Sequence, residues 1–259
     1  MTSAFTDEQI RRYSRQMILP EVGGEGQARL RESRVLVVGA GGLGSPAALY
    51  LAAAGVGTLG LLDSDRVELS NLQRQILYDL KDLGSPKALS GRARLEALNP
   101  EARVVAHCLR LGPTSAVDLL SGYDVVVEGS DSMATKFLVN DVCVRLGIPL
   151  VVAGILGWEG QLLVVRPGAT ACYRCVYRRE PAQAMPTCEA AGIVGPVAGV
   201  VGSLQGVEAL KLCLGLPTVL AGRLLLYDGT AGELVPLATA RDPACATCGV
   251  PASTSGSDR

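Results

Sequence analysis

The chain has 259 residues, of which 48% are apolar and 4% aromatic, and its formal net charge is −1. This length fits one large α/β domain, and the balanced charge excludes a basic excess of the kind that binds nucleic acid. No apolar run reaches the roughly 18–20 residues of a membrane span, and the polar N-terminus lacks the apolar centre of a signal peptide. We therefore expect a soluble, cytoplasmic protein that binds neither nucleic acid nor membranes.

The first half of the chain alternates strands with helices, beginning with a helix that Thr6 and Gln9 would cap. In chain order we expect helices over 6–15 and 26–32, a strand over 34–39, a helix over 45–55, a strand over 58–63, a long polar connection over 64–84, a helix over 86–98 capped by Ser85, a strand over 102–106, a helix over 115–120, a strand over 124–128, a helix over 133–146 and a strand over 149–153. This alternation predicts a Rossmann-like, mostly parallel sheet with right-handed crossovers.

The pattern changes after residue 153. A strand over 160–166 has no helix behind it, and 167–195 shows no clear period. An apolar helix over 196–215 precedes two strands, 223–228 and 233–238, which flank a turn. The fold class is therefore α/β, with the parallel sheet continued by antiparallel strands. The small, polar tail 250–259 is expected to be disordered.

A glycine-rich turn follows the first strand. GAGGLG carries Gly39, Gly41, Gly42 and Gly44 and matches G-x-G-x-x-G, in which glycines permit a tight turn and close approach of a phosphate. Asp63 ends the next strand, about 20 residues on, where an acid binds ribose hydroxyls. A nicotinamide-dependent oxidoreductase is one interpretation, but the single histidine, His107, has no evident catalytic neighbour.

The connection after Asp63 is rich in groups that suit a triphosphate. It holds Asp65, Asn71 and Arg74, and Lys87 follows at the start of a helix. Cations offset phosphate charge and amides position it, whereas hydride transfer needs no such cluster. At a helix N-terminus, an ammonium and the helix dipole act on the same anion. The alternative, a merely solvated loop, does not explain why apolar residues alternate with these groups.

Asp131 follows the strand over 124–128. A carboxylate just past the C-terminal end of a parallel strand lies on the crevice side of the sheet, where it could hold Mg²⁺ bound to phosphates. The same residue could cap the helix over 133–146, a common role of aspartate. Both roles are compatible.

The eight cysteines include two C-x₂-C pairs far apart in the sequence. Cys172 with Cys175 and Cys245 with Cys248 provide four thiolates, the ligand set of a closed, structural Zn²⁺ site. Disulfides or redox thiols are the alternative.

The other cysteines fall into two groups. Cys188 lies in a Pro/Gly-flanked loop and is a candidate nucleophile, although no activating base is evident. Cys108, Cys143 and Cys213 are expected in the core.

Nine motifs occur together between residues 6 and 249. They are YSRQ (13–16), RVLVVGAGGLG (34–44), LLDSD (61–65), NLQRQ (71–75), SPK (85–87), GSD (129–131), CYRC (172–175), TCEAAG (187–192) and CATC (245–248). In this order they resemble the MoeB/ThiF family, relatives of the ubiquitin-activating enzymes.

The resemblance implies an adenylyltransferase that uses Mg·ATP. Its substrate would be a small ubiquitin-like sulfur-carrier protein of the MoaD/ThiS type ending in Gly-Gly. The carrier carboxylate would attack the α-phosphate, release pyrophosphate and form an acyl adenylate, from which sulfur later displaces AMP. It also implies one domain over 1–249, with a nucleotide-binding half over about 30–155 and a half for carrier and zinc over about 156–249. A non-catalytic carrier-binding scaffold is a further alternative.

The resemblance also assigns roles to residues. The turn 39–44 would lie under the phosphates and Asp63 would bind the ribose, while Asp65 belongs to the same ATP-binding set. Asn71, Arg74 and Lys87 would hold the triphosphate, and Asp131 would serve Mg²⁺ and the phosphates.

Further implications concern partners and pathway. Arg15 would reach the ATP site of a partner subunit, which implies a homodimer. Cys188 matches a loop cysteine whose covalent role differs among members. No rhodanese domain follows the second cysteine pair, so a separate sulfur donor is expected. Molybdopterin, thiamine and tRNA thiolation pathways all remain open, and the motifs most resemble the molybdopterin type.

Overall fold

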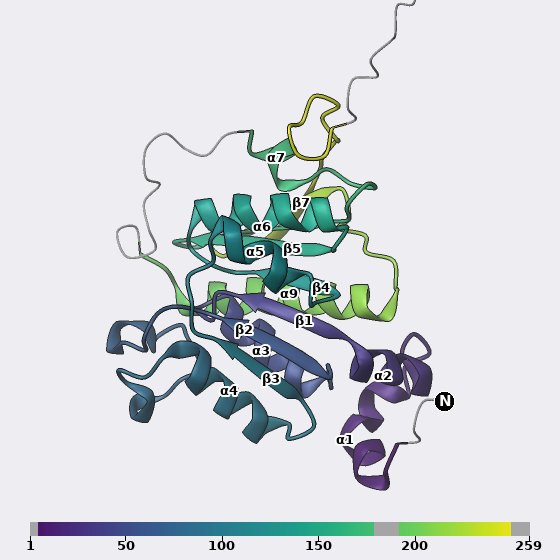
Figure 1. Ribbon diagram of the computed structural model, residues 1–259, viewed down its shortest axis with the longest axis vertical. Coiled ribbons are helices and arrows are strands. Elements are labelled where there is room, and N and C mark those ends of the chain that lie inside the picture. Colours follow the sequence, from purple (N-terminus) through teal and green to yellow (C-terminus); the bar gives the residue numbers. More distant parts are fainter. Residues whose placement is uncertain (1–4, 179–191, 250–259) are drawn as a thin grey trace, which may run out of the picture.

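One eight-stranded sheet runs through the whole molecule, with helices on both faces (Figure 1). The computed structural model describes residues 5–178 and 192–249. Its strands are β1 (Arg34–Val38), β2 (Thr58–Leu62), β3 (Arg103–His107), β4 (Val125–Glu128), β5 (Leu150–Leu156), β6 (Glu159–Val165), β7 (Arg223–Asp228) and β8 (Glu233–Ala238). Its helices are α1 (Asp7–Met17), α2 (Gly23–Glu32), α3 (Gly44–Ala53), α4 (Lys87–Leu98), α5 (Pro113–Leu120), α6 (Met133–Leu146), α7 (Tyr173–Val176) and α9 (Gly195–Leu214), with short 3₁₀ turns at Leu69–Asn71 and Leu80–Asp82.

The strand order is β3-β2-β1-β4-β5-β6-β7-β8. The first five strands in this order are parallel, and the chain moves outward from β1 first towards β3 and later towards β5. The order therefore reverses between β1 and β4. In open α/β sheets such a reversal leaves a crevice beyond the carboxyl ends of the two strands, where ligands bind.

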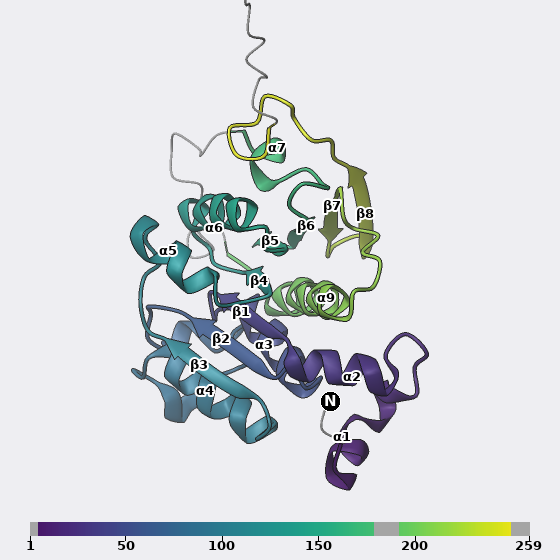
Figure 2. The ribbon, with the colours of Figure 1, turned by 45° about the vertical axis from the view of Figure 1, so that its right-hand side comes forward.

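The last three strands pair antiparallel. β5 and β6 form a hairpin with Leu150 opposite Val165 and Leu156 opposite Glu159, and β7 and β8 then extend the sheet (Figure 2). The predicted fold class, a mostly parallel sheet continued by antiparallel strands, is confirmed.

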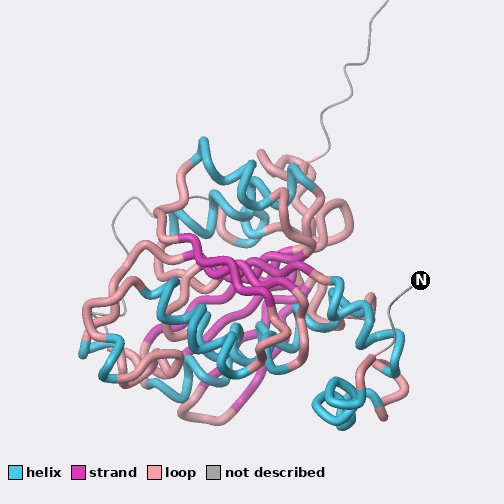
Figure 3. The backbone as a smooth tube through the Cα atoms, turned by 60° about the horizontal axis from the view of Figure 1, so that its bottom comes forward, coloured by secondary structure: helices cyan, strands magenta, loops and turns pink. Residues whose placement is uncertain are grey.

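Two apolar cores lie on opposite faces of the sheet. Figure 3 shows the helices that cover these two faces. In β1, Val35 and Val37 face the core beneath α3 and α9, while Leu36 and Val38 face the core beneath α5 and α6. All four side chains are almost fully buried. A strand covered on both faces is a near-continuous apolar run, so the composition that predicted β1 also explains its central place.

The local predictions were close but not complete. Thr6 does cap α1 in a reciprocal capping box with Gln9. Ser85 does not cap α4, because the residue that flanks its first turn is Pro86. β5 continues to Leu156 rather than ending near 153, since antiparallel pairing with β6 extends it. The helix α7 was not predicted, and part of 167–195 and the tail 250–259 lie outside the described residues.

Helix α9 is long and apolar enough to cross a membrane by length and composition, contrary to the expectation from the sequence. It packs on α3 and on β4, β5 and β6, and half of its most apolar stretch is buried. The core helix of a soluble protein has these properties, and a soluble protein fits this arrangement.

Candidate functional site

The glycine turn and the turn after β4 meet where the strand order reverses. Gly39 has φ +83, and a Cβ at this position would lie 2.8 Å from Cα of Ser130. A Cβ at Gly44 would lie 1.8 Å from the carbonyl oxygen of Gly39. Only glycine fits at either place. The two turns therefore lie in direct backbone contact at the crevice.

A cavity of about 1300 Å³ opens over these turns. Its lining includes Gly39, Gly41, Gly42, Asp63, Asp65, Arg74, Lys87 and Asp131 from the parallel half, and Gly154, Gln161, Asp228 and Val235 from the antiparallel half. Sites for single small molecules measure about 300–1,000 Å³. This cavity therefore has room for a nucleotide and for part of a second substrate.

Asp63 ties the second strand to the glycine turn. Its Oδ2 accepts from the Ala40 N–H at 2.8 Å, and its Oδ1 accepts from the Asp65 N–H at 2.8 Å. Burial raises the pKa of Asp63, although the charge of Lys87 and these hydrogen bonds oppose the rise. Asp63 is half-buried and lines the cavity beside the glycine turn.

Two cations line the same end of the cavity. The Nζ of Lys87, the first residue of α4, is buried and lies 3.3 Å from Oδ2 of Asp65. Arg74 donates through Nη1 to the Ser70 carbonyl at 3.0 Å. Both belong to the cavity lining, so an anion there would meet two positive side chains.

Two of the predicted ligands lie elsewhere in the described part of the chain. Asn71 is buried within the loop and does not line the cavity; its backbone carbonyl accepts from the N–H groups of Arg74 and Gln75 at 3.0 and 2.9 Å. It therefore shapes the turn that presents Arg74. Arg15 is exposed on α1, at the far end of the molecule from α6 (Figure 1).

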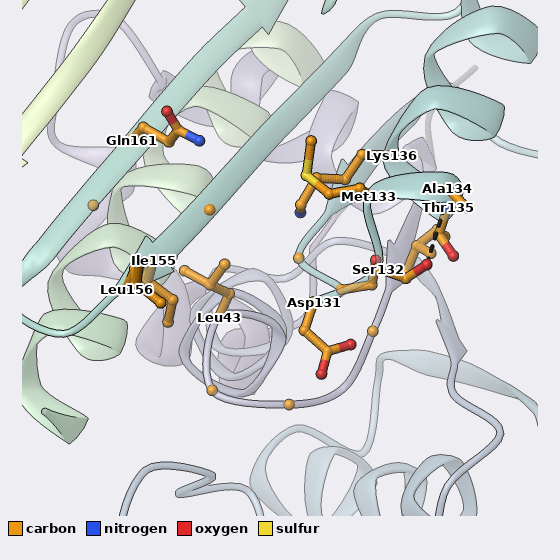
Figure 4. Close-up of a pocket in the computed structure, with 18 of the residues that line it drawn as sticks. Leu43, Asp131, Ser132, Met133, Ala134, Thr135, Lys136, Ile155, Leu156 and Gln161 are labelled. Atoms are coloured by element: carbon orange, nitrogen blue, oxygen red, sulfur yellow. Dashed lines mark hydrogen bonds between the residues drawn. The ribbon is translucent and has the colours of Figure 1, made fainter. Parts of the chain in front are cut away.

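Asp131 is exposed and lines the cavity, together with Met133 and Lys136 from the same segment (Figure 4). It is not the cap of α6, which corrects one of its two expected roles. Ser132 takes that place, because its Oγ accepts from the Thr135 N–H at 3.2 Å. The Asp131 carboxylate is therefore not used as a helix cap and lines the cavity.

Sequence reasoning missed several lining residues, including Lys136, Gln161 and Arg174. A charged residue, Glu128, at the end of the apolar strand VVVE was the available signal for a buried partner such as Lys136. Gln161 and Arg174 come from distant elements, and nothing in their local sequence indicates the cavity.

The four cysteines of the two pairs come together. Sγ of Cys172 lies 3.9 Å from Cys175 and 3.6 Å from Cys245, and Cys175 lies 3.3 Å from Cys248. All four sulfur atoms lie within 4.8 Å of one another. A tetrahedral metal with bonds of about 2.3 Å to sulfur has sulfur–sulfur edges of about 3.8 Å. The cluster therefore fits a four-coordinate metal ion.

The other cysteines differ in burial. Cys143 is buried and Cys213 half-buried, whereas Cys108 is exposed, so the expectation of a core position is wrong for Cys108. Cys188 lies outside the described residues. The sole histidine, His107, contacts the Tyr123 hydroxyl through Nε2 at 2.9 Å and does not line the cavity.

A family model described as the ThiF family matches residues 13–249. The chain belongs to the ThiF family. This confirms the resemblance on which the nine motifs agree. The chain is 49% identical over 251 residues to the sulfur carrier protein adenylyltransferase of Thermus thermophilus, and the match covers 95% of this chain and 93% of that protein.

Some relatives are longer than this chain, and the match covers only part of their length. Adenylyltransferase and sulfurtransferase MOCS3 of Bos taurus is 49% identical over 249 residues, covering 95% of this chain and 55% of that protein. The ThiF chain thus spans about half the length of that relative.

Among solved structures, E. coli MccB with MccA-N7isoASN superposes with a TM-score of 0.81 at 23% identity, covering 92% of this chain and 75% of that one. E. coli MccB with ATP gives a TM-score of 0.78 at 25% identity, covering 92% and 74%. The ThiF fold described above is therefore shared with MccB.

Proposed function

We propose that this protein uses ATP to adenylylate the C-terminal carboxylate of a small ubiquitin-like sulfur-carrier protein. The observation that carries the proposal is that one cavity joins a cationic end at Arg74 and Lys87 to a second end lined by residues of β5, β6, β7 and β8. The Thermus thermophilus relative, named for this activity, covers nearly the same length at 49% identity. MccB, of the same fold, has been solved with ATP.

The chemistry needs positioning and charge more than acid–base catalysis. The carrier carboxylate attacks the α-phosphorus, the bond from that phosphorus to the pyrophosphate oxygen breaks, and pyrophosphate leaves. A carboxylate is already deprotonated at neutral pH, so no general base is required. Arg74 and Lys87 offset the charge that builds on the phosphates, and Asp63 holds the ribose. The glycine turn, with the N-terminus of α3 behind it, accepts phosphate against its backbone.

The two metals have separate places in this proposal. Mg²⁺ bound to ATP would neutralise phosphate charge, and Asp131 would hold it, since its exposed carboxylate lines the cavity and caps no helix. Zn²⁺ would occupy the four-cysteine cluster. Four thiolates fill its coordination sphere, so this metal would be structural.

Other parts of the proposal concern partners. Arg15, exposed on α1 and away from its own cavity, would reach the cavity of a second subunit in a homodimer. A separate sulfur donor, the cytoplasm as the place of action and a molybdopterin-type pathway stay predictions. The covalent role of Cys188 also stays open.

The alternatives are less well supported. An oxidoreductase would need a hydride-transfer site, and the relatives do not favour it. A non-catalytic scaffold would not need the two cations and Asp131 to line one cavity.

The deciding experiment is ATP–pyrophosphate exchange with small Gly-Gly-ended carriers from the source genome. We expect exchange with one carrier and none with the same carrier lacking its last two glycines. Binding of NAD(H) but not ATP would support the oxidoreductase instead. Carrier binding without exchange by any carrier would support the scaffold.

A further inference from the structure

A buried ion pair lies directly behind the turn that carries Asp131. Glu128, the last residue of β4, is fully buried, and its Oε2 accepts from Nζ of Lys136 at 2.5 Å. Lys136 is 4% exposed and lies in the first turn of α6. The same Nζ donates to the carbonyl oxygen of Ala153 on β5 at 2.6 Å. One ammonium group therefore connects three elements.

The other oxygen of Glu128 holds the turn itself. Oε1 accepts from the Ser130 N–H at 3.1 Å and also from the Ser130 hydroxyl. Ser130 is the residue against which Gly39 packs, and it directly precedes Asp131. The backbone of the turn is thus held by hydrogen bonds from Ser130 to Glu128 and by the close packing of Gly39 against Ser130. In Figure 4, Asp131 and Lys136 belong to the same lining segment, and their side chains point in different directions.

Stability alone does not explain this arrangement. Removing two charges from water is costly, and apolar residues of similar volume often stabilise a core as well as a buried ion pair does. Most of the buried side chains in both cores are aliphatic. The pair contributes specificity of orientation, because its hydrogen bonds fix the backbone of the turn 129–131 at the cavity.

We propose that Glu128 and Lys136 are positioning residues that fix the turn 129–131, so that the Asp131 carboxylate faces the reacting phosphates. This inference rests on the proposed adenylylation. Glu128 is fully buried, and Lys136 lines the cavity but is only 4% exposed, with its Nζ bonded to Glu128 and to Ala153. The pair therefore acts on the reaction through Asp131. Its loss therefore affects the rate of the chemical step more than the affinity for ATP.

Three variants separate positioning from simple stabilisation. Lys136→Met leaves the Glu128 carboxylate buried without its partner. The double variant Glu128→Leu/Lys136→Met replaces the pair with apolar side chains and removes the acceptor of Ser130. Lys211→Met is the matched control, because Lys211 lies 2.7 Å from the buried Glu208 on α9, outside the cavity lining.

Exchange kinetics, thermal unfolding and amide hydrogen exchange over 129–133 are measured for each variant. For Lys136→Met we expect a lower melting temperature and a turnover number lower by roughly 100-fold. We expect its KM for ATP to change by less than about threefold and amide exchange in the turn to accelerate. The double variant should regain thermal stability but not turnover, and Lys211→Met should lose stability without losing turnover.

Several results would overturn the inference. Turnover that recovers together with stability in the double variant would show that the pair only stabilises the fold. A raised KM for ATP at unchanged turnover would make the pair part of nucleotide binding. If the wild-type protein shows no exchange with any carrier, the proposed function fails, and amide exchange in the turn alone decides whether Glu128 fixes it.

Discussion

The two halves of the sheet contribute to the same cavity in different ways. In the parallel half, loops at the carboxyl ends of β1, β2 and β4 supply backbone contacts, carboxylates and cations. In the antiparallel half, the strands themselves border the cavity, with Gly154 and Gln161 from the β5–β6 hairpin and Val235 from β8. The first arrangement suits a compact, charged ligand, whereas the second presents the face of strands that are already paired with one another, which suits a larger second substrate lying across the sheet.

Variants of the four-cysteine cluster give the largest expected effect and test whether the two halves of the sheet are stabilised independently. Cys245→Ser, or removal of the metal by a chelator, should destabilise the segments around α7 and 242–249 by several kcal/mol, because binding energy at a structural metal is folding energy. ATP binding should persist, since Arg74 and Lys87 lie in the other half. Thermal unfolding measures the loss of stability, titration calorimetry with ATP measures nucleotide binding, and metal analysis measures the metal content. Cys108→Ser, at an exposed cysteine, is the control, and simultaneous loss of ATP binding would show that the halves are one unit.

The nucleotide end is tested by Arg74→Ala. We expect exchange to fall by roughly 10²–10³-fold, because one positive group at the developing phosphate charge is lost. The fold and the metal content should not change. Arg66→Ala is the matched control, since Arg66 lies in the same loop, donates to the Gly84 carbonyl and does not line the cavity. Equal losses in both variants would contradict a specific role for Arg74.

The sequence predicts the parallel half well because its signals are local. The apolar run of β1 and the glycines that follow it specify a buried strand and a turn without knowledge of the rest of the chain. The pairing of Glu128 with Lys136 was not predictable in this way, because it depends on how α6 packs against β4 and β5.

Neighbouring residues also exchange roles in ways that composition does not reveal. Ser132 caps α6 where Asp131 was expected as a candidate, because the Ser132 hydroxyl is the group that reaches the Thr135 N–H. Asn71 lies in the predicted loop, but its backbone carbonyl holds the turn at Arg74 and its side chain does not line the cavity. The spacing of the cysteine pairs predicted the cluster but not the short helix α7, which begins directly after Cys172 and contains Cys175.

The packing of the antiparallel half is tested at Gly160 on β6. A Cβ there would lie 2.4 Å from Cγ2 of Val201 on α9, so Gly160→Ala should cost about 1–3 kcal/mol in free energy of unfolding. Adding Val201→Ala should recover part of the loss, because it removes the clashing methyl group. Gly199→Ala meets nothing within 4 Å and is the control. Urea denaturation measures each value, and independent, additive losses would argue against the clash.

The smallest expected effect concerns Asp141, which joins the two halves. This α6 residue accepts hydrogen bonds from Nε and Nη2 of Arg174, at 2.7–3.0 Å, and from the Thr247 hydroxyl at 2.8 Å. Burial raises the pKa of Asp141, but the hydrogen bonds from Arg174, Thr247 and Asn140 outweigh it, so the pKa lies below its ordinary value. The charged form is therefore favoured by folding.

A carboxyl whose pKa is lower in the folded state stabilises the protein above its unfolded pKa, and this stabilisation is lost as pH falls through the folded pKa. Asp141→Asn should therefore cost about 1 kcal/mol at pH 7, a modest value for a side chain that is one-third exposed. The difference from wild type should shrink as pH falls below about 4. Asp118→Asn, at an exposed position of α5, should show no such trend. A penalty that stays constant from pH 7 to about pH 3 would mean that the shape of Asp141, and not its charge, connects the cysteine cluster to the helix that begins beside Asp131.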